Sequence, residues 1–269
     1  EDGLNTSFNL SNVGGLTIDA AAGTDQVTVL GNVSGNTIGV VRGANTSVTV
    51  DALQSADIVT GSTEHLLISA GLGNDTTNVS GTGGPELTID GGGHSSVFPA
   101  DTLTITNTTA GTTFVDPGST PDSGSVSTPD AANNTAFVGI ESISLTGAAA
   151  TDDLVIAGTI GNDTITVANN IASVNDRAPV IFSSFDDVTL FGLDGDDTFV
   201  IDPTSLSGVT TVDVIGGLGQ DSVQVLGSSG ANAIGFNPTS STDATVTIAG
   251  DATTNISSSD SVLIDGSDG

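Results

Sequence analysis

Residues 210–227, TTVDVIGGLGQDSVQVLG, hold two short apolar runs on either side of a glycine-rich turn. Val212 and Val214 alternate with polar neighbours before the turn, and Val223 and Val225 do the same after it. Alternation with a period of two is typical of a β-strand that buries one face. Glycine and aspartate favour the tight turn between the runs. The stretch therefore predicts two strands joined by a turn, with the four valines inside.

The same phrase recurs along the chain, so the prediction extends beyond one hairpin. Related turns are AGLGNDTTNV at 70–79, GTIGNDTITV at 158–167 and GLDGDDTFVI at 192–201. The turn signals of neighbouring copies are about 24 residues apart, as from Asp197 to Asp221. Rungs of that length with short strands and polar turns predict an all-β chain folded as a parallel β-solenoid, or β-helix. Tandem β-sandwich domains are the alternative, because strands at this spacing fit them too.

The composition supports stacked β-structure. The chain of 269 residues has nine Phe but no Trp, Tyr, Met or Cys, so its core must consist of thin layers of Val, Ile, Leu and Ala. Helix-favouring Lys, Arg and Glu are scarce, whereas Val, Ile, Thr, Gly, Asn and Asp are abundant. We expect almost no helix and no disulfide bonds.

A longer repeat of about 74 residues groups the rungs. Its starting apolar residues, Leu66, Ile143, Val188 and Val262, are 77, 45 and 74 residues apart. Joining residue 269 to residue 1 continues the pattern, which predicts complementary half-units at the two ends. The predicted units are A (1–65, completed by 262–269 of a neighbouring copy), B (66–142), the short unit C (143–187), D (188–261) and the start of the next unit (262–269).

Residues 115–135, VDPGSTPDSGSVSTPDAANNT, depart from the repeat. They contain three Pro, many Ser and Thr, and no clear apolar alternation. Such a composition predicts a surface loop outside the repeating frame of unit B.

The charge restricts the partners. The formal net charge is −30, with 28 Asp and four Glu against Arg42 and Arg177. A balance this acidic argues against nucleic acid or an anionic membrane surface as partner, and favours cations. No apolar run approaches the roughly 18 residues of a membrane span, so we expect no membrane insertion.

The turns carry a family resemblance. GGLGQDSVQ at 216–224 resembles the nonapeptide of RTX calcium-binding solenoids, and the longer phrase resembles the β-strand repeats of very large bacterial surface proteins. This resemblance implies an extracellular or cell-surface protein that uses Ca²⁺ as a ligand of its turns. The aspartates that match the ligand position, or lie beside it, are Asp25, Asp75, Asp163, Asp194, Asp196, Asp197 and Asp221.

The turn aspartates have a second interpretation that needs no ion. An Asp or Asn side chain can accept hydrogen bonds from the turn backbone while glycine supplies the unusual dihedral angles. At 192–197 three carboxylates fall within four positions, and a cation would relieve their repulsion. Both interpretations stay open at the level of sequence.

Ten N-x-S/T sequons are present, of which Asn32, Asn45, Asn107, Asn133 and Asn255 are the candidate glycosylation sites. Enzymatic motifs are weak. His65 and His94 lack metal-ligand spacing, there are no aromatic platforms of Trp or Tyr for sugars, and the two Arg offer few candidate bases.

We therefore expect a non-enzymatic extracellular structural protein, the subunit of a head-to-tail filament or surface array stabilised by divalent cations. Its main partner is then another copy of itself, with glycans as a second class of partner. The alternatives are a segment of a giant cell-surface adhesin and, less favoured, a β-helix enzyme acting on polysaccharides.

Overall fold

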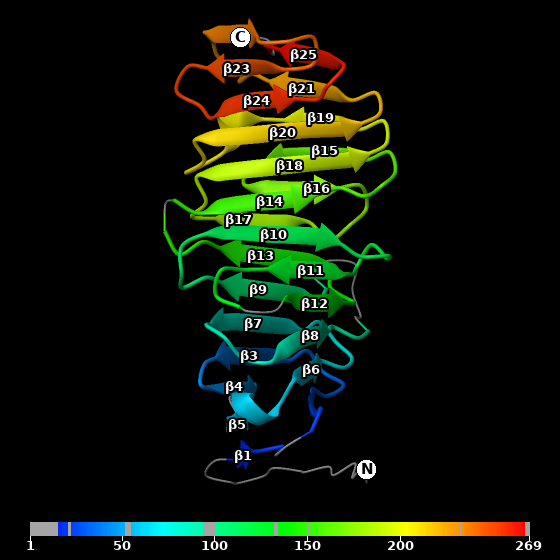
Figure 1. Ribbon diagram of the computed structural model, residues 1–269, viewed down its shortest axis with the longest axis vertical. Helices are drawn as coiled ribbons and strands as arrows, with labels where there is room; N and C mark the ends of the chain where they lie inside the picture. Colours follow the sequence, from blue (N-terminus) through cyan, green and yellow to red (C-terminus); the bar gives the residue numbers. More distant parts are fainter. Residues whose placement is uncertain are drawn as a thin grey trace.

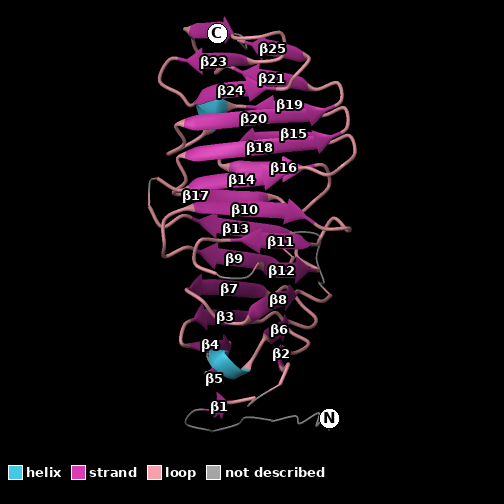
Figure 2. Cartoon of the chain, viewed as in Figure 1, coloured by secondary structure: helices cyan, strands magenta, loops and turns pink. Residues whose placement is uncertain are grey.

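The computed structural model describes residues 16–20, 23–51, 55–93, 100–131, 134–149, 151–231 and 233–266. These residues form two long sheets that face each other along one axis. Figure 1 shows the strands stacked from β1 at one end to β25 and β23 near the other, and Figure 2 shows that strands account for nearly all of the regular structure. The predicted all-β solenoid is confirmed.

Within the described residues, the chain passes back and forth between the two sheets and in four places lays three successive strands in the same sheet. The larger sheet has 13 described strands, which are, in spatial order, β1 (Leu16–Ile18), β5 (Ala56–Val59), β4 (Asn45–Val50), β3 (Thr37–Arg42), β7 (Thr76–Gly81), β9 (Thr102–Thr106), β13 (Ser142–Thr146), β17 (Val180–Ser183), β16 (Ile171–Val174), β15 (Thr164–Ala168), β19 (Thr198–Ile201), β21 (Ser222–Leu226) and β25 (Ser261–Asp265). The smaller sheet has 12, which are β2 (Gln26–Leu30), β6 (His65–Ser69), β8 (Glu86–Asp90), β12 (Thr135–Val138), β11 (Gly124–Ser127), β10 (Thr112–Pro117), β14 (Asp153–Ala157), β18 (Asp187–Asp194), β20 (Thr211–Leu218), β24 (Thr253–Ser257), β23 (Ala244–Ile248) and β22 (Ile234–Pro238).

A simple rung contains one strand from each sheet. The chain runs from β18 through β19 to β20, and β20 pairs in parallel beside β18 with Val188 opposite Val212, 24 residues later. The rung length matches the prediction, because one pair of strands and two turns fill it. Since the sheets run without interruption through the described chain, tandem sandwich domains do not describe this fold.

The solenoid also contains antiparallel runs that the sequence did not predict. Four three-stranded meanders, β3–β5, β10–β12, β15–β17 and β22–β24, occur within the described residues. In each, the chain advances along the sheet and then returns by two antiparallel steps. The tight turn between β15 and β16 has Asn169 at φ 54° and Asn170 at φ 57°, as a type I′ hairpin requires.

The meanders account for the unequal repeat spacing. Leu66, Ile143, Val188 and Val262 lie in β6, β13, β18 and β25, each of which directly follows a meander. We call these four strands the anchor strands. Counting the anchor strand itself, four strands precede the next meander when the count starts at β6 or β18. Only two precede it when the count starts at β13. The shorter spacing after Ile143 follows from those two missing strands.

The prediction of a loop at 115–135 is wrong. This segment contains the end of β10 and all of β11, the middle strand of a meander. Val115 and Val126 lie opposite each other in the antiparallel pair and are 7% and 1% exposed. Two buried valines among Ser, Gly and Pro are too sparse to produce a visible alternation, so the sequence pattern missed the strand.

The core lies between the sheets and is built from the inward residue of each alternating pair. Val212, Val214, Val223 and Val225 are at most 1% exposed, as predicted from the opening stretch. Each fully buried valine contributes roughly 1.5–3 kcal/mol of transfer free energy. Regular helix within the described residues is confined to the 3-10 turns η1 (Thr60–Ser62) and η2 (Pro203–Ser205), and neither is long enough to cross a membrane.

Candidate functional site

Acidic and amide side chains form a column along the side of the 13-stranded sheet where its parallel strands begin. Each occupies the residue directly before a strand, so the solenoid stacks them one above another. We call this set the aspartate column; it consists of Asn36, Asp75, Asp101, Glu141, Asp163, Asp197, Asp221 and Asp260. The sequence analysis missed four of the eight, Asn36, Asp101, Glu141 and Asp260, because their common property depends on where each strand starts.

The column members are joined by hydrogen bonds between backbone and side chain. The backbone N–H of Asp163 donates to Oδ1 of Asp197 at 2.8 Å, and that of Asp197 donates to Oδ1 of Asp221 at 2.9 Å. The N–H of Asp221 continues the series to Oδ2 of Asp260 at 3.0 Å. The side chains thus extend the sheet's hydrogen bonding by one residue, just before the backbone enters the strand.

A second run of the same kind lies nearer β1. Here the N–H of Asn36 donates to Asp75, the N–H of Asp75 to Asp101 and the N–H of Asp101 to Glu141, at 2.5–2.7 Å. The meander β15–β17 separates this run from the first. Asp25 lies directly before β2 in the smaller sheet, and its N–H donates to Oε2 of Glu64, which lies directly before β6, at 2.7 Å.

Several column carboxylates have one oxygen without a partner. Asp75, Asp197 and Asp221 are 1–2% exposed, and in each Oδ2 is buried and makes no hydrogen bond. Burial raises the pKa of Asp197; the hydrogen bond from Asp163 lowers it in part, and the neighbouring Asp221, Asp163 and Asp196 raise it further. Burial likewise raises the pKa of Asp75. These carboxyls are therefore costly to keep ionised.

Asp163 differs because both of its carboxylate oxygens accept further hydrogen bonds from nearby residues. Its Oδ2 accepts from the N–H of Thr159 at 2.6 Å, and Asn175 donates to its Oδ1. In the next turn, β18 and β20 continue their pairing as far as Asp194 and Leu218. That longer pairing changes the shape of the turn, and Oδ2 of Asp197 receives no such amide.

A glycine five residues before each of Asp163, Asp197 and Asp221 makes room for the carboxylate. A Cβ on Gly192 would lie 2.2 Å from Oδ2 of Asp197 and 2.3 Å from the carbonyl oxygen of Gly216 in the next rung. One carboxylate oxygen and one carbonyl oxygen therefore face the same small space. Ca²⁺ takes six to eight oxygen ligands, so the buried column by itself does not fit a full calcium site.

The two outer aspartates of the GLDGDD turn are exposed. Asp196 lies beside the column and accepts from the N–H of Gln220 at 2.9 Å, while its own N–H donates to Asn162 at 2.9 Å. Asp194 lies at the end of β18, opposite Leu218. The structure thus stacks Asp163, Asp197 and Asp221 one per rung instead of gathering the predicted ligands around one point.

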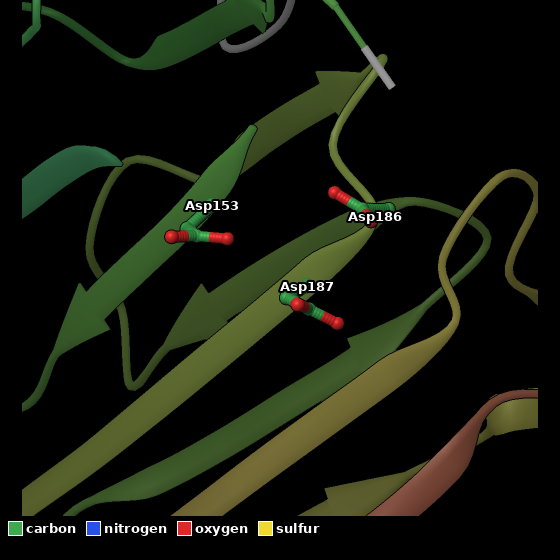
Figure 3. Close-up of side chains that lie close together, drawn as sticks. All are labelled: Asp153, Asp186 and Asp187. Atoms are coloured by element: carbon green, nitrogen blue, oxygen red, sulfur yellow. The ribbon is translucent and has the colours of Figure 1, made fainter. Parts of the chain in front are cut away.

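Three other carboxylates do converge. Asp153 on β14 lies opposite Asp187 on β18, and Asp186 precedes it, with one oxygen of each within 4.8 Å of the others (Figure 3). Within the described part of the chain, this is the acidic group compact enough to hold a metal ion. Oδ1 of Asp186 is buried without a hydrogen-bond partner. The sequence signal for this cluster was the FDD at 185–187 beside the TDD at 151–153.

The candidate glycosylation sites differ in accessibility. Asn32 and Asn45 are exposed. Asn107 is 5% exposed and its amide donates to Thr113 at 2.7 Å, which disfavours a glycan there in the folded chain. The amide of Asn255 donates to Asp213 at 2.8 Å in the middle of the smaller sheet. Asn133 lies outside the described residues.

The outer face of the smaller sheet has an open hollow of about 410 Å³. Phe114 and Phe191 border it, and Asp213 is the one carboxylate among the described residues that line it. His65 lies elsewhere on this sheet and contacts Thr88, with Nε2 2.9 Å from the hydroxyl oxygen. His94 lies outside the described residues.

Comparison of the chain with protein-family models and with curated proteins finds no match.

Proposed function

We propose that this chain is a non-enzymatic structural element of an extracellular fibre or surface array, in which copies join end to end. The observation that carries the proposal is the state of the two ends of the stack. Among the described residues, β25 and β22 each pair on one side at one end, and β1 and β2 do so at the other. Open strand edges over an apolar core favour further strand pairing.

The ends also repeat the interior pattern. The last described strands are a meander, β22–β24, followed by an anchor strand, β25, as in the middle of the molecule. Leu263 of β25 is 59% exposed and Phe236 of β22 is 50% exposed. Repeat proteins that end without polar capping units are prone to associate through their ends.

The cavities and charges support a non-enzymatic role. A glycoside hydrolase needs two carboxylates flanking its substrate, and the hollow described above contains one, Asp213. Both arginines are already engaged. Arg42 donates to the carbonyl of Gly83 and the hydroxyl of Thr135, and Arg177 donates to the carbonyls of Gly118 and Thr120.

Divalent cations form the second part of the proposal. The net charge of −30, which already counts both arginines, must be offset from solution when copies approach. Oxygen-seeking Ca²⁺ suits the Asp153, Asp186 and Asp187 cluster, where three carboxylates meet near the surface and water can complete the coordination. The exposed Asp194 and Asp196 are weaker candidates because each stands in a separate row.

Electron microscopy of the purified 269-residue chain, with calcium and with a chelator, tests the proposal. Unbranched filaments are expected, with fewer or shorter filaments after chelation. Discrete particles in both conditions would contradict it.

A segment of a giant adhesin is the second candidate, because the same open edges would then join covalently linked units. The mass of the natural polypeptide under denaturing conditions separates the two. A value near 26.3 kDa supports separate subunits, and a value many times larger supports the giant chain. The resemblance to RTX-like and β-strand-repeat surface proteins favours an extracellular or cell-surface location in both cases.

A further inference from the structure

Among the described strands β25 pairs on one side only, and its free side has a counterpart inside the molecule. β25 directly follows a meander and pairs in parallel with β21, with Val262 opposite Val223. β18 also directly follows a meander and pairs in parallel with β14. On its other side, β18 is covered by β20. The interior of the solenoid therefore shows which kind of strand pairs with the second side of an anchor strand.

β1, which pairs on one side only among the described strands, corresponds to β20, the strand that covers β18. β20 pairs with β24, the last strand of a meander, and β1 pairs with β5, which is also the last strand of a meander. Val212 and Val214 point into the core from β20, and Leu16 and Ile18 are the half-buried residues of β1. The environment of β1 thus corresponds to that of β20 with its β18 neighbour removed.

We infer that β25 of one copy pairs in parallel with β1 of a second copy, with Val262 opposite Leu16, Leu263 opposite Thr17 and Ile264 opposite Ile18. This inference rests on the proposed end-to-end function and specifies the contact. The register is the one in which Val188 faces Val212 and Leu190 faces Val214 in the interior. It continues the core layer across the junction, because Val262, Ile264 and Ile18 already pack against the core from their own side.

The strand numbers of the two sheets set the spacing of the junction. One sheet has 13 described strands and the other has 12. A continuous solenoid must gain equal numbers in both, so direct pairing of β25 with β1 leaves a place for one strand between β22 and the next copy's β2. The axial repeat is then 13 strands, or about 62 Å at about 4.8 Å per strand.

The register also predicts a charge effect. Residue 265 of one copy falls opposite residue 19 of the next, and both are Asp. Like charges directly opposite on neighbouring strands destabilise the pairing. Assembly is therefore expected to strengthen as ionic strength rises, because salt screens exposed charges.

Disulfide trapping tests the contact, and the chain is suited to it because it has no cysteine. Thr17 and Leu263 are both exposed on the outer face, and directly opposite strand residues have a Cα separation that a disulfide can span. The double variant Thr17→Cys/Leu263→Cys, oxidised after assembly, is expected to give a ladder of covalent oligomers on a non-reducing gel. The ladder should collapse to monomer on reduction.

The matched control is Thr28→Cys/Leu263→Cys. Thr28 is also exposed near the same end but lies on β2, in the other sheet, so this variant is expected to give no ladder. Filaments that form in the first variant without its ladder, or equal ladders in both variants, would overturn the β25–β1 pairing while leaving end-to-end assembly standing. Absence of both filaments and ladder would overturn the pairing together with the proposed function.

Discussion

The backbone N–H of Asp197 donates a 2.9 Å hydrogen bond to Oδ1 of Asp221 in the next rung, while Oδ2 of Asp221 is buried without a partner. One half of the carboxylate therefore stabilises the stack, and the other half is an unsatisfied buried oxygen. The same division holds for Asp197 and Asp75. This relationship separates the hydrogen-bonding role of these aspartates from their charge, and each can be tested alone.

Replacing Asp197 by Asn is expected to stabilise the chain. Asn keeps the oxygen that accepts from the N–H of Asp163 and removes a buried charge. Its amide also puts a donor into the small space that the unpartnered oxygen and the carbonyl of Gly216 both border. A gain of about 1 kcal/mol would raise the midpoint of thermal unfolding by about 2–4 °C. Asn36 already occupies an equivalent position in the column.

The matched control for this variant is Asp197→Ala, which also removes the acceptor. It is expected to lower the free energy of unfolding by about 1–3 kcal/mol, because the buried N–H of Asp163 loses its partner. If Asn and Ala variants lose stability equally in the presence of a chelator, the charge itself is required and the hydrogen-bonding explanation is wrong.

Acidification is expected to strengthen the column. The pKa values of Asp75 and Asp197 are raised in the folded chain, so the folded state binds protons more tightly than the unfolded state. Their contribution to stability is fully present below the ordinary Asp pKa of about 3.9 and is lost as pH rises through the folded values.

The measurement for this prediction is the unfolding midpoint as a function of pH, from neutral to mildly acidic. The double variant Asp75→Asn/Asp197→Asn serves as reference, because every other carboxylate is common to both proteins. The wild-type chain should gain more stability on acidification than the variant does. Parallel curves would mean that these two groups do not titrate differently in the folded and unfolded states.

Gly192 is expected to tolerate no side chain. A Cβ there would lie 2.3 Å from the backbone carbonyl oxygen of Gly216, and backbone in a stacked rung cannot move aside without disturbing its neighbours. Gly192→Ala should cost about 1–3 kcal/mol or more. Gly61→Ala is the control, since nothing lies within 4 Å of its Cβ position; it should change stability little or raise it by about 0.4–1 kcal/mol. Equal midpoints for the two variants would contradict the packing argument.

Asp187→Asn is expected to change the response to calcium. Asp153 and Asp187 are directly opposite on parallel strands, and removing one charge should relieve about 0.2–1 kcal/mol of repulsion in the presence of a chelator. If the cluster binds calcium, added calcium should raise the unfolding midpoint of the wild-type chain more than that of the variant. Asp116→Asn, on the neighbouring β10, controls for charge alone. An identical calcium response in all three proteins would remove the cluster from the proposal.

Much of the fold followed from local patterns. The alternation around Val212 and Val223 predicted strands with the correct inward faces, because side-chain direction in a strand depends only on position along it. The 24-residue distance between Asp197 and Asp221 predicted the rung. The segment at 115–135 escaped because its two buried valines, Val115 and Val126, are surrounded by small polar residues.

The candidate site was less accessible to sequence reasoning. Asp75, Asp163, Asp197 and Asp221 were found through their turns, but Asp101, Glu141 and Asp260 occupy the same column in turns of different sequence. Their common property is position directly before a strand, which becomes visible once strand boundaries are known. The cluster brings Asp153 together with Asp186 and Asp187, which are 33 and 34 positions later, because β14 and β18 are neighbours.

The sequence by itself determined the all-β character, the inward valines and the glycine-aspartate turns, because each depends on the dihedral preferences and spacing of nearby residues. Only the tertiary structure decided that the chain reverses in meanders, that the column carboxylates accept backbone hydrogen bonds, and which edges stay open. Those features depend on which rung lies beside which. Residues far apart in sequence set that order jointly, through sheet hydrogen bonds and the shared core, and no local pattern encodes it.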